Sequence, residues 1–255
     1  MIVPTYNEIE NIDDVVSMVL SHEGYHLLIV DDSSPDGTAK RVEELAQNHI
    51  GRLHLLVRES KKGLGAAYLH GFKWGINQGY DILCEMDADL SHDPSVLPNL
   101  IDPVLKGDAD LAIGSRFIEG GSIPNWSLHR KLLSRGGNLY ARFMLGLKVN
   151  DTTGGFRAYG VNLLKTILTQ DVKADGYGFQ IEMTYISRIC DARIVEIPIV
   201  FVDRVRGDSK MSFNIVIEAL WLVTLWSLRD KFFSRNKAKL RRKSYLEADI
   251  GSGAV

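Results

Sequence analysis

The sequence predicts an α/β fold, with a mostly parallel central sheet flanked by helices. Apolar runs typical of buried strands recur in the first half of the chain, at Leu27–Val30, Leu53–Val57, Ile82–Met86 and Leu111–Gly114. Amphipathic segments with helical spacing surround them, at Ile9–Leu20, Thr38–Gln47, Leu64–Asn77 and Pro94–Lys106. Strands that alternate with helices are typical of a parallel sheet covered on both faces.

The remaining elements are less regular. Met1–Val3 form a short first strand before Pro4, and Gly154-Gly155-Phe156-Arg157 is a turn into another short strand. We expect, in this order, a basic amphipathic helix, a second helix, a strand and a long apolar helix at Leu128–Leu147, Phe179–Cys190, Ile194–Val202 and Phe213–Phe233.

Bulk composition excludes few classes of protein. The chain has 255 residues, 45% of them hydrophobic, and a net charge of −2, so we expect no general attraction to nucleic acid. Cys84 and Cys190 lie in apolar sequence and are expected to be buried thiols in a reduced compartment rather than a disulfide. The apolar stretch Ala219–Trp226 is shorter than the about 20 residues that a membrane span needs.

Three polar motifs directly follow predicted strands, at Pro4–Glu8, Asp31–Asp36 and Asp87–Ser91. Ligands of parallel sheets bind beyond the carboxyl ends of the strands, so we expect these motifs to share one crevice. Tyr6 can pack on a base, and Glu8 and the paired Asp31-Asp32 can accept hydrogen bonds from a base or a ribose. The alternative for the first two motifs is a turn that starts a helix.

The triplet Asp87-Ala88-Asp89 predicts a metal site. Two carboxylates two positions apart at a strand end can converge on Mg²⁺ or Mn²⁺, which prefer oxygen ligands. The cation would neutralise a diphosphate leaving group. Taken alone, the triplet fits an ordinary acidic turn better, because such turns are common after strands, but its place beside two other polar motifs favours the metal. Lys61–Gly65 lacks the spacing of a P-loop and no GxGxxG occurs, which argues against an NTPase and a dinucleotide oxidoreductase.

Taken in order, these motifs resemble the inverting family 2 glycosyltransferases of the GT-A fold. Further segments are similar to dolichyl- and polyprenyl-phosphate mannose synthases, namely Gly63–Tyr68, Asp89–His92, Gly114–Arg116, Gly176–Gln180 and Asp203–Lys210. The resemblance implies transfer of mannose from GDP-mannose to a polyprenyl or dolichyl monophosphate, giving a β-linked product.

The resemblance also implies roles for individual residues. Nucleotide-sugar binding falls to Pro4, Tyr6, Glu8, Val30, Asp32, Asp87, Ala88, Asp89, Arg116, Arg204 and Lys210. Acceptor-phosphate binding falls to Arg116, Arg130 and Arg204, and catalytic roles fall to Asp89, Arg116 and Arg204. The metal ligands would be Asp87, Asp89 and Ser91, the last at a position where archaeal relatives have Gln.

The chemistry of the reaction agrees with these residue types. A phosphate monoester is an anion near neutral pH, so the acceptor needs cations and in-line geometry rather than a strong base. Arginine suits this task because its planar fork can bind phosphate through two hydrogen bonds. His92 follows the acidic triplet, and we expect it to be structural.

An isoprenoid acceptor requires an apolar approach near a membrane. Leu128–Leu147 and Phe213–Phe233 combine apolar and basic residues, as interfacial helices do. We expect the first to be buried against the sheet and the second to attach to the membrane. Attachment would be peripheral, on the cytoplasmic side, or through a separate membrane-spanning partner. The basic run Arg229–Lys243 is either a solvated tail or an anionic-membrane contact.

The expected domains are a catalytic domain (1–212) with nucleotide-binding (1–115) and acceptor-binding (116–212) halves, an amphipathic membrane-associating helix (213–233) and a basic, disordered tail (234–255). Two other functions remain open. The donor could be UDP-glucose or another sugar nucleotide, since the acidic triplet contacts diphosphate rather than base or sugar. The chain could also be a non-catalytic nucleotide-sugar-binding scaffold, against which the retained acidic and basic residues argue. A nucleotidyltransferase is disfavoured because Pro4–Glu8 is not a Gly-rich loop.

Overall fold

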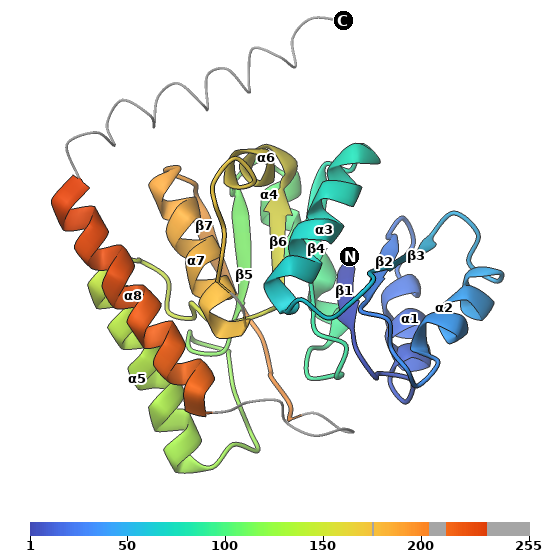
Figure 1. Ribbon diagram of the computed structural model, residues 1–255, viewed down its shortest axis with the longest axis horizontal. Coiled ribbons are helices and arrows are strands. Elements are labelled where there is room, and N and C mark those ends of the chain that lie inside the picture. The colour runs from blue at the N-terminus through green and yellow to red at the C-terminus, as the bar shows by residue number, and fades with distance from the viewer. Residues whose placement is uncertain (175, 204–212, 234–255) are drawn as a thin grey trace, which may run out of the picture.

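The computed structural model describes residues 1–174, 176–203 and 213–233, and these contain one seven-stranded sheet. Its strands are β1 (Ile2–Thr5), β2 (Leu27–Asp31), β3 (Leu53–Val57), β4 (Ile82–Glu85), β5 (Leu111–Ser115), β6 (Arg157–Gly160) and β7 (Ile194–Pro198), in the spatial order β3-β2-β1-β4-β6-β5-β7. Neighbouring strands are parallel except at β6, which runs antiparallel to β4 and β5. The predicted mostly parallel sheet is confirmed (Figure 1).

The helices also agree with the sequence pattern. They are α1 (Ile12–Leu20), α2 (Thr38–Ala46), α3 (Leu64–Asn77), α4 (Leu97–Leu105), α5 (Leu128–Leu145), α6 (Val161–Ile167), α7 (Gly176–Ile189) and α8 (Phe213–Phe233). The segment predicted at Pro94–Lys106 is divided into a 3₁₀ turn, Pro94–Val96, and α4. The short helix α6 was not predicted.

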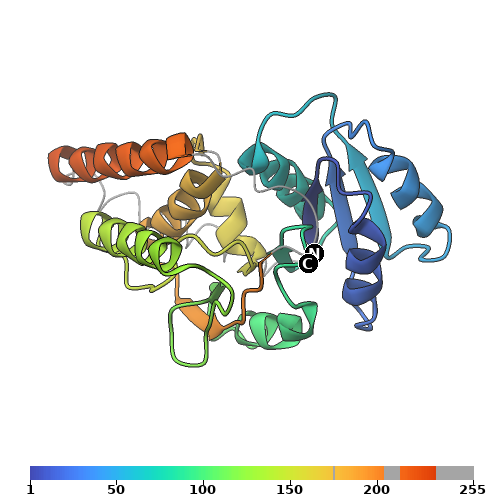
Figure 2. The ribbon, with the colours of Figure 1, turned by 90° about the horizontal axis from the view of Figure 1, so that it is seen from below.

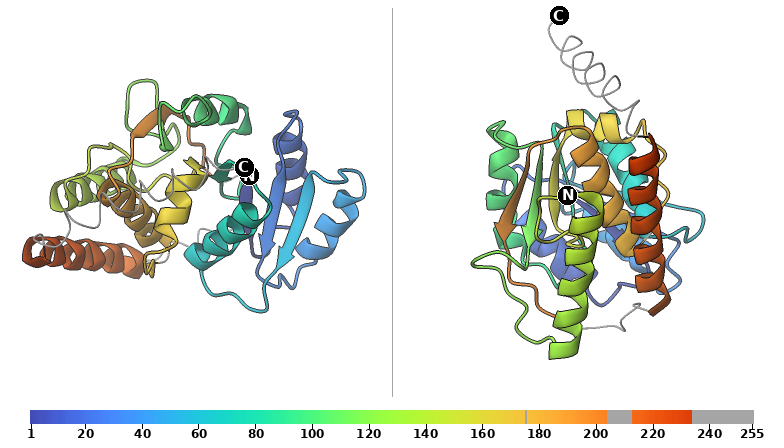
Figure 3. Two further views of the ribbon diagram at one scale, coloured as in Figure 1. Left: turned by 90° about the horizontal axis from the view of Figure 1, so that it is seen from above. Right: turned by 90° about the vertical axis from the view of Figure 1, so that its left-hand side faces the viewer.

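Two hydrophobic cores, one on each face of the sheet, follow from the alternation of side chains along the strands. Ile2 and Val3 are consecutive in β1 and buried, yet they belong to different cores. Side chains of α3, α6 and α7 fill the first core, and those of α1 and α4 fill the second. Figure 3 shows these helices on opposite sides of the sheet.

Helices α5 and α8 lie side by side at one end of the molecule, and α8 also packs on α7 (Figures 1 and 2). Tyr140 Oη of α5 lies 2.7 Å from Thr224 Oγ1 of α8. On the α7 side, the ring of Tyr185 stacks on Trp226 with centroids 5.9 Å apart, and its hydroxyl donates to Asp230. Aromatic and polar contacts therefore fix α8 on the rest of the protein.

Both helices expose large apolar side chains. Those of α5 are Leu128, Leu132, Leu133, Leu139 and Phe143. The expectation that this segment is buried against the sheet holds for one face only: Ala141 and Leu145 join a core that includes side chains of β5, while α5 packs mainly on α8 and leaves these five side chains exposed. Those of α8 are Ile217, Leu220, Trp221, Leu225 and Leu228, opposite a buried side that includes Val223 and Trp226. Among its described side chains α8 thus carries apolar residues on both its buried and its exposed sides, together with the exposed charges of Glu218 and Arg229. No helix among the described residues is long and apolar enough to cross a membrane.

Candidate functional site

The polar motifs meet at one edge of the sheet. Strands β1, β2, β4 and β5 run in the same direction, so the residues that follow them lie at the same edge. Contacts between the motifs confirm this convergence for the first two. The hydroxyl of Thr5 donates to Asp31 at 2.8 Å, and the amide of Asn7 donates to Ser34 Oγ at 3.0 Å.

Asp31 holds this edge together rather than facing a ligand. Its side chain is fully buried and accepts hydrogen bonds from Thr5 Oγ1, Ser34 N and Ser34 Oγ at 2.8, 2.8 and 2.6 Å. A carboxylate with this set of partners organises the turn after β2. Of the paired carboxylates, the one suited to contact a nucleotide is therefore Asp32.

Asp32 forms a buried ion pair with Arg58, a residue that the sequence analysis missed. The Arg58 Nη1 atom lies 3.2 Å from Asp32 Oδ1, and both side chains are less than a tenth exposed. Burial raises the pKa of Asp32, and the charge of Arg58 opposes that rise only in part. The available signal was positional, because Arg58 directly follows β3 at the same sheet edge.

The other predicted nucleotide-binding residues differ in what they present. Tyr6 is half-buried, and Lys61 Nζ lies 4.2 Å from its ring centroid. Glu8 accepts a hydrogen bond from Asn11 Nδ2 at 2.9 Å. Pro4 is half-buried and pairs in register with Val30 of β2. The side chain of Val30 is fully buried, which leaves only its main chain to reach a nucleotide.

The acidic triplet follows β4 directly after Met86. The hydroxyl of Tyr68 in α3 lies 3.4 Å from Asp87 Oδ1, to which it donates. The amide of Ser91 donates to Asp89 Oδ1 at 3.1 Å, across Leu90, whose φ of +61° makes the tight turn. The side chain of Ala88 is buried, so it spaces the two carboxylates. The geometry presents both carboxylates on one turn.

The oxygen ligands at this turn suit a hard divalent cation only if oxygen atoms of the substrate complete its coordination. No three His, Cys, Asp or Glu side chains gather closely enough to hold a metal in the described part of the chain. Two carboxylates are nevertheless what Mg²⁺ commonly takes from a protein when phosphate oxygens and water supply the rest. Ser91, the third predicted ligand, is 2% exposed, and its part in metal binding stays a prediction.

His92 lies beside the triplet, with its Nε2 atom 3.9 Å from Asp87 Oδ2, and its ring packs against aromatic side chains. Its ring centroid is 5.2 Å from that of Phe156 and 5.1 Å from that of Phe201. Burial lowers the pKa of His92 to about 4, so the ring is neutral near pH 7. These contacts agree with the structural role expected for it.

Arg116 follows β5 and is anchored by Asp151. Its Nε and Nη2 atoms donate to the two carboxylate oxygens at 2.6 and 2.8 Å, and Nη2 also donates to Thr153 Oγ1 at 2.8 Å. Burial alone would raise the pKa of Asp151, but Arg116 outweighs it and the pKa lies below its usual value. The Nε–Nη2 edge therefore serves Asp151, which excludes the expected two-bond grip on phosphate through that edge.

Arg130, at the start of α5, lies against Trp126 and Asp203. Its guanidinium carbon is 3.8 Å from the Trp126 ring centroid, and Nη1 lies 2.8 Å from Asp203 Oδ1. The Trp126 indole also donates to Asp203 at 3.1 Å. Both predicted acceptor-side arginines that the structure describes are thus held by carboxylates and aromatic rings. The two other predicted cations, Arg204 and Lys210, lie outside the described residues.

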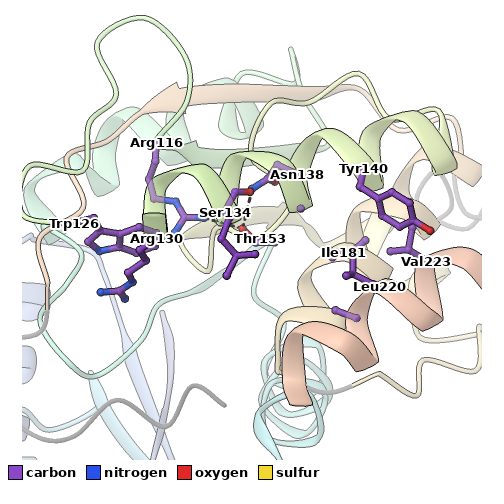
Figure 4. Close-up of a pocket in the computed structure, with 13 residues that line it drawn as sticks. Arg116, Trp126, Arg130, Ser134, Asn138, Tyr140, Thr153, Ile181, Leu220 and Val223 are labelled. Atoms are coloured by element: carbon purple, nitrogen blue, oxygen red, sulfur yellow. Dashed lines mark hydrogen bonds between the residues drawn. The ribbon is translucent and has the colours of Figure 1, made fainter. Parts of the chain in front are cut away.

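A cavity connects these arginines to the two apolar helices. It is lined by Arg116, Trp126, Arg130, Leu133, Ser134, Gly137, Asn138, Tyr140, Thr153, Ile181, Ala219, Leu220 and Val223. Figure 4 shows Arg116 and Arg130 at one end, and Tyr140, Leu220 and Val223 at the other. One end therefore suits an anion and the other suits hydrocarbon. The sequence analysis did not predict this cavity, because α5 and α8 are far apart in the chain.

Comparison with known proteins agrees with this arrangement. Residues 1–168 match the family model described as glycosyl transferase family 2. The chain belongs to this family. The predicted resemblance to family 2 glycosyltransferases is therefore confirmed.

Individual relatives of this family 2 glycosyltransferase carry more specific names. Polyprenol monophosphomannose synthase of Mycolicibacterium smegmatis is 46% identical over 91% of the chain and 87% of its own length. Undecaprenyl-phosphate mannosyltransferase of Micrococcus luteus is 46% identical over 89% of the chain and 93% of its own length. Dolichol-phosphate mannosyltransferase of Pyrococcus furiosus is 35% identical over 86% of the chain and 61% of its own length.

Solved structures support the fold of this glycosyltransferase. A mannosyltransferase from Pyrobaculum calidifontis, in complex with GDP-Man and Mn²⁺, superposes with a TM-score of 0.53 at 18% identity and covers the whole chain and 75% of its own. TarS of S. aureus (residues 1–349) gives a TM-score of 0.55 at 16% identity, over 97% of this chain and 77% of its own. The expected GT-A architecture is thus shared with known glycosyltransferases.

Proposed function

We propose that this glycosyltransferase transfers mannose from GDP-mannose to a polyprenyl or dolichyl monophosphate and gives a β-linked lipid-phosphate mannose. The observation that best supports a lipid-monophosphate acceptor is the cavity between α5 and α8, which has a cationic end and an apolar end. A lipid monophosphate has the same two parts. The names of the relatives at 46% identity support the same acceptor class and the same sugar.

Donor recognition would take place at the ends of β1 and β2. Tyr6 offers a ring for the base, and the Asp32–Arg58 pair sets a hydrogen-bond acceptor beside a donor. Guanine presents a complementary edge, with the O6 acceptor and the N2 donor. Other bases also combine a donor with an acceptor, so the experiment below includes UDP-glucose as the competing donor.

A divalent cation, Mg²⁺ or Mn²⁺, would be held by Asp87 and Asp89, with Ser91 as a further candidate, and would stabilise the charge of the leaving diphosphate. The remaining protein groups act on the acceptor. Arg116 and Arg130 bring the acceptor phosphate to the anomeric carbon against its repulsion from the diphosphate. Asp151 and Trp126 hold these arginines in place.

The bond changes need no strong base. A phosphate oxygen that is already ionised forms the new bond to the anomeric carbon, while the bond from that carbon to the diphosphate breaks and GDP departs. Attack from the face opposite the leaving group inverts the configuration. The carboxylates of Asp151 and Asp203 stay paired with arginines, so neither is needed to remove a proton.

Membrane attachment would be peripheral, on the cytoplasmic side, through the exposed apolar faces of α5 and α8. Phe143 and Trp221 are 84% and 62% exposed there, and Arg135 is a neighbouring basic residue. Such a surface suits the boundary of a bilayer. The basic run Arg229–Lys243 begins in the last turn of α8, and its part from residue 234 onward lies outside the described residues. Its contact with anionic lipid stays a prediction, as does a separate membrane-spanning partner.

The test is a transfer assay with labelled GDP-mannose, a short-chain polyprenyl phosphate and Mg²⁺ or Mn²⁺. We expect a lipid-linked mannose that is absent when the metal is chelated. UDP-glucose is assayed in parallel under the same conditions. Turnover of UDP-glucose without any lipid-linked mannose would overturn the mannose assignment, and no turnover of any sugar nucleotide would favour a binding scaffold.

A further inference from the structure

Two charged residues face each other in the core directly behind the acidic triplet. Glu85 in β4 and Arg157 in β6 are partners in the antiparallel register, and both are 0% exposed. Removing charges from water costs several kcal/mol per ion, so a buried pair of charges is weak evidence for a role in stability. The Glu85–Arg157 pair lies between the proposed donor and acceptor sides of the site, which suggests a role in placing residues of the site.

Glu85 is tied to two elements besides its own strand. The Tyr159 hydroxyl of β6 donates to Oε1 at 2.5 Å, and Gln180 Nε2 of α7 donates to Oε2 at 2.9 Å. Arg157 Nη1 in turn lies 3.4 Å from the Tyr159 hydroxyl. Tyr159 thus links the two charges.

Arg157 holds the loop that precedes it. Its Nε atom donates to the carbonyl of Gly154 at 2.7 Å, and Nη2 donates to the carbonyl of Thr152 at 2.9 Å. Nη1 donates to the carbonyl of Gln180 and to Thr184 Oγ1, both at 3.0 Å. The guanidinium therefore fastens loop 151–155 to α7.

That loop touches both halves of the site. Asp151 and Thr153 hold the guanidinium of Arg116. On the other side, a Cβ atom added to Gly155 would lie 3.3 Å from Asp87 Oδ2, and one added to Gly154 would lie 2.8 Å from the carbonyl oxygen of Gly114. The loop is wedged between the ends of β4 and β5.

We propose that Glu85 and Arg157 are positioning residues that fix loop 151–155 and thereby set Arg116 relative to Asp87. Transfer requires the diphosphate and the acceptor phosphate to be in line, and a displacement of about 1 Å can cost on the order of 100-fold in rate. The identity of these two substrates rests on the proposed function. Neither residue touches a substrate in this role.

The test separates placement from stability with Glu85→Gln, Arg157→Lys, Arg157→Met and the double variant Glu85→Gln/Arg157→Met. Val19→Ala, a cavity variant in the core of α1, is the control for a general loss of stability. For each protein we would measure thermal unfolding, the Kd of GDP with Mn²⁺ by calorimetry, and kcat with the sugar nucleotide that the wild type turns over.

We expect kcat to fall on the order of 100-fold in the Arg157 variants, while the Kd of GDP with Mn²⁺ changes less than about threefold. The double variant should unfold at a higher temperature than Arg157→Met, because no charge is left unpaired, yet its kcat should stay low. If Arg157→Met does not accumulate as folded protein, kcat and the Kd of GDP are compared in Glu85→Gln and Arg157→Lys instead.

Two outcomes would overturn the inference. In the first, kcat falls no further than in Val19→Ala at a matched loss of thermal stability. In the second, the double variant recovers kcat together with stability. A wild type that turns over a different donor would refute the proposed function alone, since the split between kcat and Kd would still be measured with that donor.

Discussion

Arg116 reaches Asp151 through two parallel hydrogen bonds, from Nε at 2.6 Å and from Nη2 at 2.8 Å. The pair is almost completely buried, with side chains 4% and 0% exposed. The Asp151 carboxylate thus orients the guanidinium of Arg116, which we propose binds the acceptor phosphate. Removing that carboxylate should alter both the stability of the protein and its reaction.

For stability, we expect Asp151→Asn to lower the free energy of unfolding at pH 7 by about 3 kcal/mol, because Arg116 is left buried without a counter-charge. The folded pKa of Asp151 is below its usual value, so this stabilisation is present above the unfolded pKa. It is lost as the pH falls through the folded pKa. Urea unfolding from pH 7 down to about pH 3.5 should therefore show the difference between wild type and variant shrinking only at the acid end.

Asp102→Asn is the matched control, since Asp102 pairs with Lys106 on the surface of α4 and both side chains are more than half exposed. This change should cost less than about 1 kcal/mol. Equal losses in the two variants would show that the buried pair contributes no more than a surface pair.

For the acidic triplet, we expect Asp89→Ala to reduce transfer by on the order of 1000-fold because it removes a charge next to the leaving diphosphate. Asp89 is half-buried, and its carboxylate accepts a hydrogen bond from the amide of Ser91. A loss of about 1 kcal/mol in stability should accompany the change. Electron paramagnetic resonance of Mn²⁺ in the presence of GDP measures the loss of metal binding. Thermal unfolding followed by circular dichroism measures the loss of stability. Asp108→Asn, an exposed carboxylate after α4, should alter neither, and near-normal transfer by Asp89→Ala would remove Asp89 from metal binding.

For the acceptor side, Arg130→Ala should raise the KM for polyprenyl phosphate about tenfold, because one charge-assisted contact to phosphate is lost. The KM for GDP-mannose should change little, since Arg130 lies in the cavity between α5 and α8. Arg135→Ala, an exposed cation on the same helix, is the matched control and should leave both constants unchanged. Steady-state kinetics with each substrate varied in turn would decide. A rise in the KM of GDP-mannose alone would place Arg130 on the donor side.

For membrane attachment, we expect the double variant Phe143→Ser/Trp221→Ser to bind anionic vesicles at least about tenfold more weakly, because both exposed rings would lose their burial in lipid. Ile50→Ser is the control, since Ile50 is 87% exposed on the segment before β3, away from α5 and α8. Flotation with phosphatidylglycerol vesicles provides the measurement. Equal binding by all three proteins would refute attachment through this surface.

The basic run can be tested separately. A truncation at Arg229 would also remove Asp230, which accepts a hydrogen bond from Tyr185 and helps to fix α8. Deletion of residues 234–255 leaves that contact intact. The shortened chain should bind anionic vesicles more weakly and neutral vesicles equally well, because the removed residues are rich in Lys and Arg. Unchanged binding to anionic vesicles would leave the run as a solvated tail.

Local sequence pattern was sufficient for most of the secondary structure and for the edge at which the motifs meet. Leu27–Val30 and Ile82–Met86 are apolar enough to be buried strands, and polar residues directly after such strands must emerge at their carboxyl ends. The placement of Asp32, Asp87, Asp89 and Arg116 at one edge follows from that rule.

The partners of these residues were not predictable in the same way. Asp151 and Arg157 act on Arg116 and on the loop beside it from positions distant in the chain. No period or spacing in a single sequence indicates that β6 inserts between β4 and β5. The exposed face of α5 was also misjudged, because its pattern does not reveal that α8 is its main partner.

The inserted strand β6 has a consequence for the spacing between the two proposed sides of the site. Asp87 follows β4 and Arg116 follows β5, and β6 lies between these two strands. Neighbouring strands lie about 4.8 Å apart, so two such steps separate the strand ends by about 10 Å. The number of strands between β4 and β5 thus sets the distance between the residues that follow them. A fold that paired β4 directly with β5 would halve this distance and bring the proposed diphosphate side and the proposed acceptor-phosphate side of the site closer together.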